Sequence, residues 1–186
     1  MALFEDGVLA DARHELLGRG HAERLVPLIA GLPGRGRADE IRVSLGPGSF
    51  TGTRIGISAA RALALAWRAE VRGYPTLALV AAMAGPGPLS VAMTGGHGEM
   101  FIQNFAADGL PESGHHSLTL ADALSRPLHR RVAGSRAQEL VSARGSGEPV
   151  PVLPDARHAL ALPDTLLTRS LAPIYGRPPD AKLPGR

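Results

Sequence analysis

The glycines and hydroxyl residues between positions 46 and 52 are the residues best suited to chemistry in this sequence. Glycine lets a backbone approach a ligand closely. Backbone N–H groups near the beginning of a helix carry partial positive charge, which favours a bound phosphate. The candidate phosphate-binding residues of this turn are Gly46, Gly48, Ser49, Thr51 and Gly52.

The turn matches neither of the two best-known phosphate-binding motifs. A Walker A loop places Lys and then Ser or Thr after its last glycine, whereas Thr53 and Arg54 follow Gly52 here. A dinucleotide fingerprint needs an acidic residue about 20 positions later, at the end of the next strand, to bind ribose, and the sequence predicts no acidic residue in that place. The alternative is a tight turn in which Ser49 or Thr51 caps the following helix.

Other patterns typical of enzymes are missing from the sequence. No two histidines have the i, i+4 spacing that places two imidazoles on one helix face, and the neighbours His115 and His116 rarely converge on one ion. Ser49 has no recognisable His and acid partners, and there is no cysteine. We therefore predict no catalytic residue, no bound metal and no cofactor for this chain.

Small residues recur along the helix predicted after the turn. One strip holds a small residue at every fourth position: Gly52, Gly56, Ala60 and Ala64. A second strip is bulkier and apolar: Ile55, Ala59, Ala62, Leu63 and Ala66. A helix that is apolar over most of its circumference is buried on several sides. Either it is buried within its own domain, or one strip contacts the sheet and the other a partner's helix.

The remaining pattern predicts an α/β protein. We expect strands at residues 1–4, 8–13, 41–45, 89–94, 99–105, 131–133 and 150–153. We expect helices at residues 20–30, from the glycine-rich turn to about residue 71, and at 76–84, 118–124 and 135–142. Residues 85–88 read Gly-Pro-Gly-Pro and mark a boundary. This order predicts a sheet covered by helices.

Composition restricts the protein class. Hydrophobic residues make up 44% of the 186 residues and aromatic residues 4%, and the formal net charge is +3. No apolar run approaches the roughly 20 residues that cross a bilayer, and Glu5 and Asp6 interrupt any secretory signal. With no cysteine, a cytoplasmic location is expected. The one basic cluster, residues 129–131, has no aromatic neighbours for stacking nucleic-acid bases.

At residues 46–56 the sequence Gly-Pro-Gly-Ser-Phe-Thr-Gly-Thr-Arg-Ile-Gly resembles the signature of the TsaB (YeaZ) family. Residues 18–25 resemble the first helix of that family, and residues 173–177 resemble its Pro-x-Tyr-x-Arg tail. The resemblance implies a two-lobed, actin-like (ribonuclease-H-like) α/β fold. Its expected parts are an N-terminal lobe at residues 1–84, a C-terminal lobe at 85–172 and an extended, proline-rich tail at 173–186.

The resemblance also implies a function. The family is a non-catalytic scaffold and dimerisation subunit for threonylcarbamoyladenosine modification of tRNA. It docks onto and stabilises the catalytic paralogue TsaD, and the ATPase TsaE joins the complex, so that ATP is used by the complex rather than by this chain. A homodimer is expected when the chain is alone, with tRNA contacted only indirectly and no membrane. The implied interface residues are His21, Leu25, Leu28, Ile29, Gly52, Arg54, Ile55, Gly56, Ala59, Ala60 and Leu63.

Two enzymatic activities fit the sequence less well than this scaffold role. In TsaD a metal-binding His-x-x-x-His follows the equivalent helix, and Thr76 and Val80 stand in those positions here. A nucleotide-dependent enzyme of the actin-like superfamily, using the turn at 46–52 for phosphate, is the alternative function. The glycoprotease-like peptidase activity attached to relatives of this fold lacks a nucleophile, a metal pair and a base in this sequence.

The sequence departs from the family pattern at two places. The family opens with a central strand carrying Ile-Asp-Thr-Ser-like residues, whereas Met1-Ala2-Leu3-Phe4 resembles the second strand. The N-terminal lobe is therefore expected to lack its first strand: either the start of the sequence is truncated or misassigned, or another segment takes that place. If the gap stays open, an unpaired strand edge is exposed. At residues 94–99, Thr-Gly-Gly-His-Gly-Glu replaces a basic turn of the family.

Overall fold

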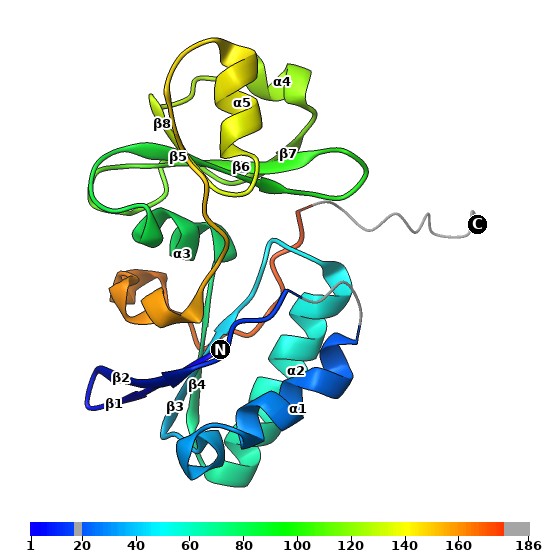
Figure 1. The fold of residues 1–186 in the computed structure, drawn as a ribbon, viewed down its shortest axis with the longest axis vertical. Coiled ribbons are helices and arrows are strands. Elements are labelled where there is room, and N and C mark those ends of the chain that lie inside the picture. Colours follow the sequence, from blue (N-terminus) through cyan, green and yellow to red (C-terminus); the bar gives the residue numbers. More distant parts are fainter. Residues whose placement is uncertain (17–19, 177–186) are drawn as a thin grey trace, which may run out of the picture.

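The computed structural model describes residues 1–16 and 20–176 and has two lobes, one above the other in Figure 1. In Figure 1 the N-terminus lies in the lower lobe, and the C-terminal end of the described chain lies near the junction of the two lobes. The predictions that fall on residues 17–19 and 177–186, including Gly18, Arg19, Arg177 and most of the proline-rich tail, lie outside the described residues.

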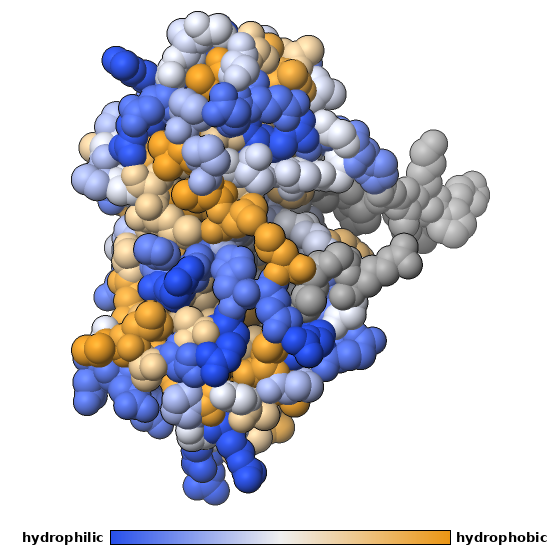
Figure 2. Space-filling model, viewed as in Figure 1, coloured by the Kyte–Doolittle hydropathy of each residue, from blue (hydrophilic) through white to orange (hydrophobic). Residues whose placement is uncertain are grey.

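The N-terminal hairpin is confirmed. Strand β1 (Ala2–Glu5) pairs antiparallel with β2 (Val8–Ala12), with a bulge after Leu3. Asp6 and Gly7 both have positive φ, 49° and 78°, which is the geometry that a two-residue hairpin turn requires. Val8 is 69% exposed, and Figure 2 shows an apolar patch over this hairpin at the left edge of the molecule.

The glycine-rich turn joins a strand to a long helix, as predicted. Strand β3 (Glu40–Ser44) leads into the turn, and α2 (Phe50–Trp67) follows it and packs on β3. The chain then returns as β4 (Glu70–Tyr74), which pairs in parallel with β3. This strand corrects the helix expected to run to about residue 71. The helix ends earlier because Arg68 adopts φ 60°, the left-handed C-cap conformation usually taken by glycine.

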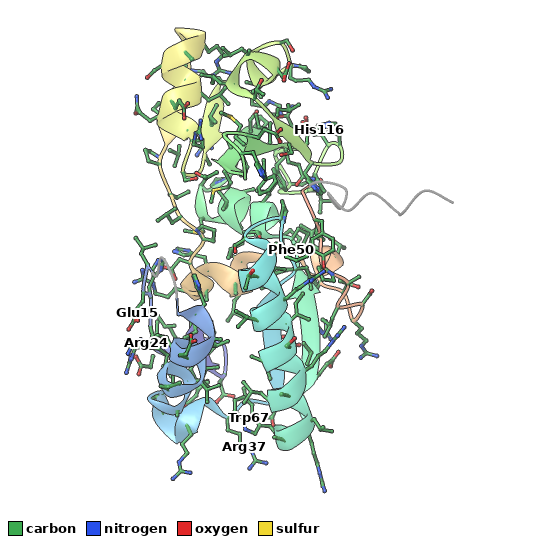
Figure 3. The ribbon with its side chains drawn as sticks, turned by 90° about the vertical axis from the view of Figure 1, so that its right-hand side faces the viewer. Glu15, Arg24, Arg37, Phe50, Trp67 and His116 are labelled. Atoms are coloured by element: carbon green, nitrogen blue, oxygen red, sulfur yellow. The ribbon has the colours of Figure 1, made fainter. Side chains whose placement is uncertain are left out.

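Helix α1 (His21–Ala30) lies beside α2 and confirms the helix predicted at residues 20–30. It contains Pro27, and none of its residues is buried. A short 3₁₀ turn, η1 (Pro33–Gly36), follows it and leads to β3. Figure 3 shows α1 and α2 side by side along the lower lobe, with Glu15 and Arg24 on the outer side of α1.

The C-terminal lobe is a mixed sheet with helices on both faces (Figure 1). Its strand order is β7-β6-β5-β8-β9. The strands are β5 (Leu89–Thr94), β6 (Met100–Phe105), β7 (His116–Leu118), β8 (Arg131–Ala133) and β9 (Glu148–Val150). The helices of this half are α3 (Thr76–Met83), α4 (Leu120–Leu124) and α5 (Ala137–Arg144). Two 3₁₀ turns follow, η2 (Ala156–Ala161) and η3 (Asp164–Leu166).

The core has two parts, one on each face of this sheet. Successive residues of a strand point to opposite faces, so Val91 packs with α3 while its neighbour Ala92 packs with α5. Helix α3 has five buried residues, which fits its uniformly apolar sequence. Burial raises the pKa of Tyr74, which lies in the α3 cluster, to about 12.

The C-terminal segment, residues 168–176, returns to the N-terminal lobe. Thr168 pairs with Gly73 on β4, and the Ile174 amide donates to the Leu45 carbonyl over 2.7 Å. Residues 168–172, which were expected to belong to the C-terminal lobe, therefore pack on the N-terminal lobe instead.

Strand β7 and the turns η2 and η3 were not predicted from the sequence. Strand β9 begins two residues earlier than expected and ends before Pro151, which lacks an N–H for the ladder.

Candidate functional site

The glycine-rich turn is held mainly by contacts within the chain. Ser49 is the N-cap of α2, and its Oγ accepts a hydrogen bond from the Gly52 amide over 3.3 Å. Gly46 has φ 102° and lies directly under the C-terminal segment, so that an added Cβ would overlap the carbonyl oxygen of Ile174. The part of the turn around Gly48 and Thr51 is exposed. The predicted capping role of Ser49 is therefore confirmed, and half of the turn is covered by the chain itself.

An aromatic and cationic cluster lies beside this turn. The Arg54 guanidinium stacks over the Phe50 ring, 3.7 Å from its centroid, and its Nε donates to the Tyr175 hydroxyl over 2.9 Å. The rings of Phe50 and Tyr175 are 5.3 Å apart. Figure 3 shows Phe50 at the first turn of α2, next to the end of the described chain. This cluster fastens the C-terminal segment to the start of α2.

A groove of about 270 Å³ lies between α1 and the first turns of α2, and we call it the α1–α2 groove. It brings together six of the eleven predicted interface residues: His21, Leu25, Leu28, Gly52, Ile55 and Gly56. The apolar residues that α1 contributes are only half-buried. The groove is therefore open and largely apolar between the two helices, and residues 1, 13–15, 154 and 156 complete its lining.

The other predicted interface residues lie elsewhere. A larger cavity of about 910 Å³ between β1 and β3 is lined by Ile29, Ala59, Ala60 and Leu63. Of these, Ala60 is only 5% exposed. Arg54 belongs to the aromatic cluster already described.

The strip of small residues on α2 faces the protein's own sheet from Gly56 to Ala64, whereas Gly52 lines the α1–α2 groove. Ala60 and Ala64 are buried, and a Cβ added at Gly56 would lie 3.8 Å from the Val43 side chain on β3. Small side chains at these positions let the helix approach the strand closely. The small-residue strip therefore contacts the sheet of its own domain, an arrangement that both predicted alternatives allow.

One strong ion pair lies at the wall of the α1–α2 groove. Asp155, between the groove residues Pro154 and Ala156, pairs with the Arg157 guanidinium, and His14 Nδ1 is 3.4 Å from its Oδ2. The Arg157 hydrogen bonds hold the pKa of Asp155 far below its usual range, and the charge of His14 acts in the same direction. Asp155 is therefore ionised beside the groove. No sequence motif indicates that His14 approaches Asp155, because the two residues come together only when the chain around η2 packs against the N-terminal segment.

Thr76 and Val80, the two positions that the family resemblance aligned with metal ligands, make other contacts here. The Thr76 hydroxyl, at the first residue of α3, is 2.5 Å from the Ser44 hydroxyl. Val80 is fully buried and has no donor atom. Among residues 1–16 and 20–176, no three His, Cys, Asp or Glu side chains gather as a metal site would need. Over the same residues, no helix has the length and apolar character to span a bilayer.

Comparison with known proteins places this geometry in a family. Residues 14–109 match the family described as TsaD, tRNA N6-adenosine threonylcarbamoyltransferase. Over 86 residues the chain is 37% identical to the tRNA threonylcarbamoyladenosine biosynthesis protein TsaB of Escherichia coli K12. The solved structure of YeaZ from Pseudomonas aeruginosa superposes with a TM-score of 0.71 at 27% identity. This chain belongs to the TsaB/YeaZ family.

The extent of each match differs. The alignment with Escherichia coli TsaB covers 44% of this chain and 37% of that protein. The Pseudomonas aeruginosa YeaZ structure matches over 87% of this chain and 83% of its own. A second structure, titled an uncharacterized protein with similarity to peptidase YEAZ from Pseudomonas aeruginosa, also has a TM-score of 0.71, at 26% identity. The predicted actin-like α/β fold of the TsaB/YeaZ family is confirmed.

Proposed function

We propose that this chain is a non-catalytic subunit of the machinery that forms threonylcarbamoyladenosine in tRNA, and that it binds a TsaD-type subunit through the α1–α2 groove. Family membership supports the pathway, because the relative from Escherichia coli is named for this biosynthesis. A role in tRNA modification would place the protein in the cytoplasm. A TsaE-type ATPase completes the proposed assembly.

The observation that carries the docking proposal is the open surface of α1. None of its ten residues is buried, although Leu25, Leu28 and Ile29 are apolar and lie toward α2. Half-buried apolar side chains in a groove between two helices fit the exposed face of another helix. In the absence of TsaD, a second copy of the chain would cover the same surface as a homodimer.

The non-catalytic role is supported by the positions equivalent to the TsaD metal ligands. Thr76 uses its hydroxyl in a bond with Ser44, and Val80 packs in the core. Both side chains therefore serve the packing of α3 rather than a metal. The alternative, nucleotide binding at residues 46–52, has a direct test. Titration calorimetry of the isolated chain with ATP and Mg²⁺ should give no binding heat, and a saturable heat would favour the alternative.

Co-purification with the TsaD-type subunit tests the docking proposal. Leu28→Arg places a charge in the groove and should weaken binding at least about tenfold, as expected for a central interface residue. Val26→Arg is the matched control, because Val26 lies on the same helix, is 57% exposed and does not line the groove. Docking through the groove would be refuted if both variants bound the TsaD-type subunit as well as the parent protein does. It would also be refuted if both lost binding to the same extent. Circular dichroism checks that both variants are folded.

A further inference from the structure

Three arginines lie along the exposed outer side of α2, and we call this surface the arginine face. Arg54, Arg61 and Arg68 are seven positions apart, which is close to two helical turns, so they lie on nearly the same side of the helix. All three are exposed. At a rise of about 1.5 Å per residue, the arginine face is roughly 21 Å long. Figure 3 shows α2 running along the lower lobe from Phe50 to Trp67.

No carboxylate of the described residues neutralises this face. Helix α2 contains no Asp or Glu, and none of the ion pairs among residues 1–16 and 20–176 includes Arg54, Arg61 or Arg68. Glu70, the first acidic residue after the helix, is already paired with Arg72 and Arg169. The arginine face therefore keeps three positive charges, as many as the formal net charge of the whole chain, +3.

Two of the three side chains are held in place by neutral groups. Arg54 stacks on Phe50 and donates from Nε to the Tyr175 hydroxyl, and a terminal nitrogen of Arg61 donates to the Leu171 carbonyl over 3.3 Å. Each guanidinium has further N–H groups in a planar fork, and these remain for a ligand. Side chains that are already oriented lose less conformational freedom on binding. The arginine face is therefore suited to an anion that has acceptor atoms at several points.

A nucleic-acid backbone has this chemistry. Phosphate oxygens accept paired N–H bonds from a guanidinium, and successive phosphates repeat the charge along a strand. An acidic protein surface would have to match three charges spread over roughly 21 Å, whereas a phosphate backbone offers acceptors all along that length. We propose that the arginine face binds the phosphate backbone of RNA, so that this chain contacts the tRNA substrate of the machinery directly.

The identity of the RNA as tRNA rests on the proposed function, whereas the charge and geometry of the arginine face do not depend on it. The family resemblance implies only an indirect contact with tRNA, so a direct contact goes beyond it. None of the three arginines lines the α1–α2 groove. A TsaD-type subunit in the groove and RNA on the arginine face would therefore occupy different sides of α2.

Salt-dependent binding of an unmodified tRNA transcript tests the proposal. Arg61→Gln and Arg68→Gln are combined in the full chain, and Arg54 is kept because it belongs to the predicted interface residues. Fluorescence anisotropy of a labelled transcript gives the Kd between about 50 and 200 mM salt. The double variant should bind about tenfold more weakly at the lower salt concentration. The slope of log affinity against log salt should fall by about 1.4–1.8, since each lost phosphate contact contributes about 0.7–0.9.

A charge-matched control removes two arginines from the other lobe. Arg126 and Arg130 are both exposed there, and Arg126→Gln combined with Arg130→Gln should leave the Kd and the salt slope nearly unchanged. Residues 177–186 are present in every variant, so their basic side chains cannot cause the difference. Equal loss in the two double variants would assign binding to net charge and overturn the proposal. Unchanged binding in the Arg61 and Arg68 variant, or no binding of tRNA by the parent chain with or without the TsaD-type subunit, would also overturn it.

Co-purification with the TsaD-type subunit distinguishes failure of this inference from failure of the proposed function. The Arg61 and Arg68 double variant should still bind that subunit while its tRNA binding falls. Retained docking with unchanged tRNA binding would overturn the inference and leave the docking proposal standing. Loss of docking in this variant would assign the arginine face to an acidic surface of the partner protein and overturn RNA binding there. Circular dichroism checks that all variants are folded.

Discussion

Replacement of Gly46 by alanine should destabilise the fold and release the C-terminal segment. The residue has φ 102°, and an added Cβ would overlap the Ile174 carbonyl oxygen. A strained backbone conformation costs about 1–3 kcal/mol. Displacing Ile174 also breaks its bond to the Leu45 carbonyl, which contributes about 0.5–1.5 kcal/mol. Together the loss should be about 1.5–4.5 kcal/mol in the free energy of unfolding, or roughly 3–18 °C in Tm.

Gly48→Ala is the matched control in the same turn. Gly48 has no positive φ, and the nearest atom to an added Cβ is the Thr53 Oγ1 at 3.7 Å, an ordinary contact. Its unfolding free energy should stay within about 0.5 kcal/mol of the parent protein. Urea unfolding followed by circular dichroism measures both variants, and exchange of the Ile174 amide reports release of the segment. A loss below about 1 kcal/mol for Gly46→Ala, or an equal loss for Gly48→Ala, would refute the reasoning.

Three more perturbations test contacts that join distant parts of the chain. The pKa of Asp155 is lowered in the folded state, so its stabilisation is complete above the unfolded pKa of about 4 and is lost as pH falls further. Asp155→Asn should therefore flatten the dependence of unfolding free energy on acid pH, and an unchanged slope would contradict the ion pair. Arg54→Ala and Tyr175→Phe should show a coupling of about 0.5–1 kcal/mol in a double-mutant cycle by urea unfolding, whereas additivity would show that the contact contributes nothing. Gly73→Ala would place a Cβ 2.6 Å from Leu45 side-chain carbons and should cost about 1–3 kcal/mol, with a smaller further cost in a Leu45→Ala background; equal costs in both would refute the clash.

Local patterns in the sequence were sufficient for the elements with clear boundaries. The Asp6-Gly7 pair predicted the hairpin turn, and Ser49 predicted the cap of α2, because both are local contacts. Strand β4 was missed because the apolar pattern of α2 continues without a glycine or proline at position 68. Arg68 takes the left-handed conformation instead, and that choice depends on the pairing of β4 with β3.

Contacts between distant segments explain the other differences. Nothing near Gly46 in the sequence indicates that Ile174 covers it, or that Arg54 bonds Tyr175, 121 positions away. The predicted interface residues came from family resemblance, and packing separated them into the α1–α2 groove, the cavity between β1 and β3 and the aromatic cluster. The burial of Ala60 and Ala64 could not be decided from spacing, because a small-residue strip fits a partner helix and a neighbouring strand equally well.

The position of the C-terminal segment has a consequence for synthesis of the protein. Thr168 and Ile174 make their bonds to Gly73 and Leu45, which leave the ribosome far earlier. The turn and strand β4 therefore gain these partners only after residues 168–174 have been made, roughly a hundred residues later. Loop closure over such a separation is slow, so the nascent chain holds β3 and β4 with incomplete partners until then. A stop codon that removes only the last few residues of this segment would act on the first lobe to be made rather than on the last.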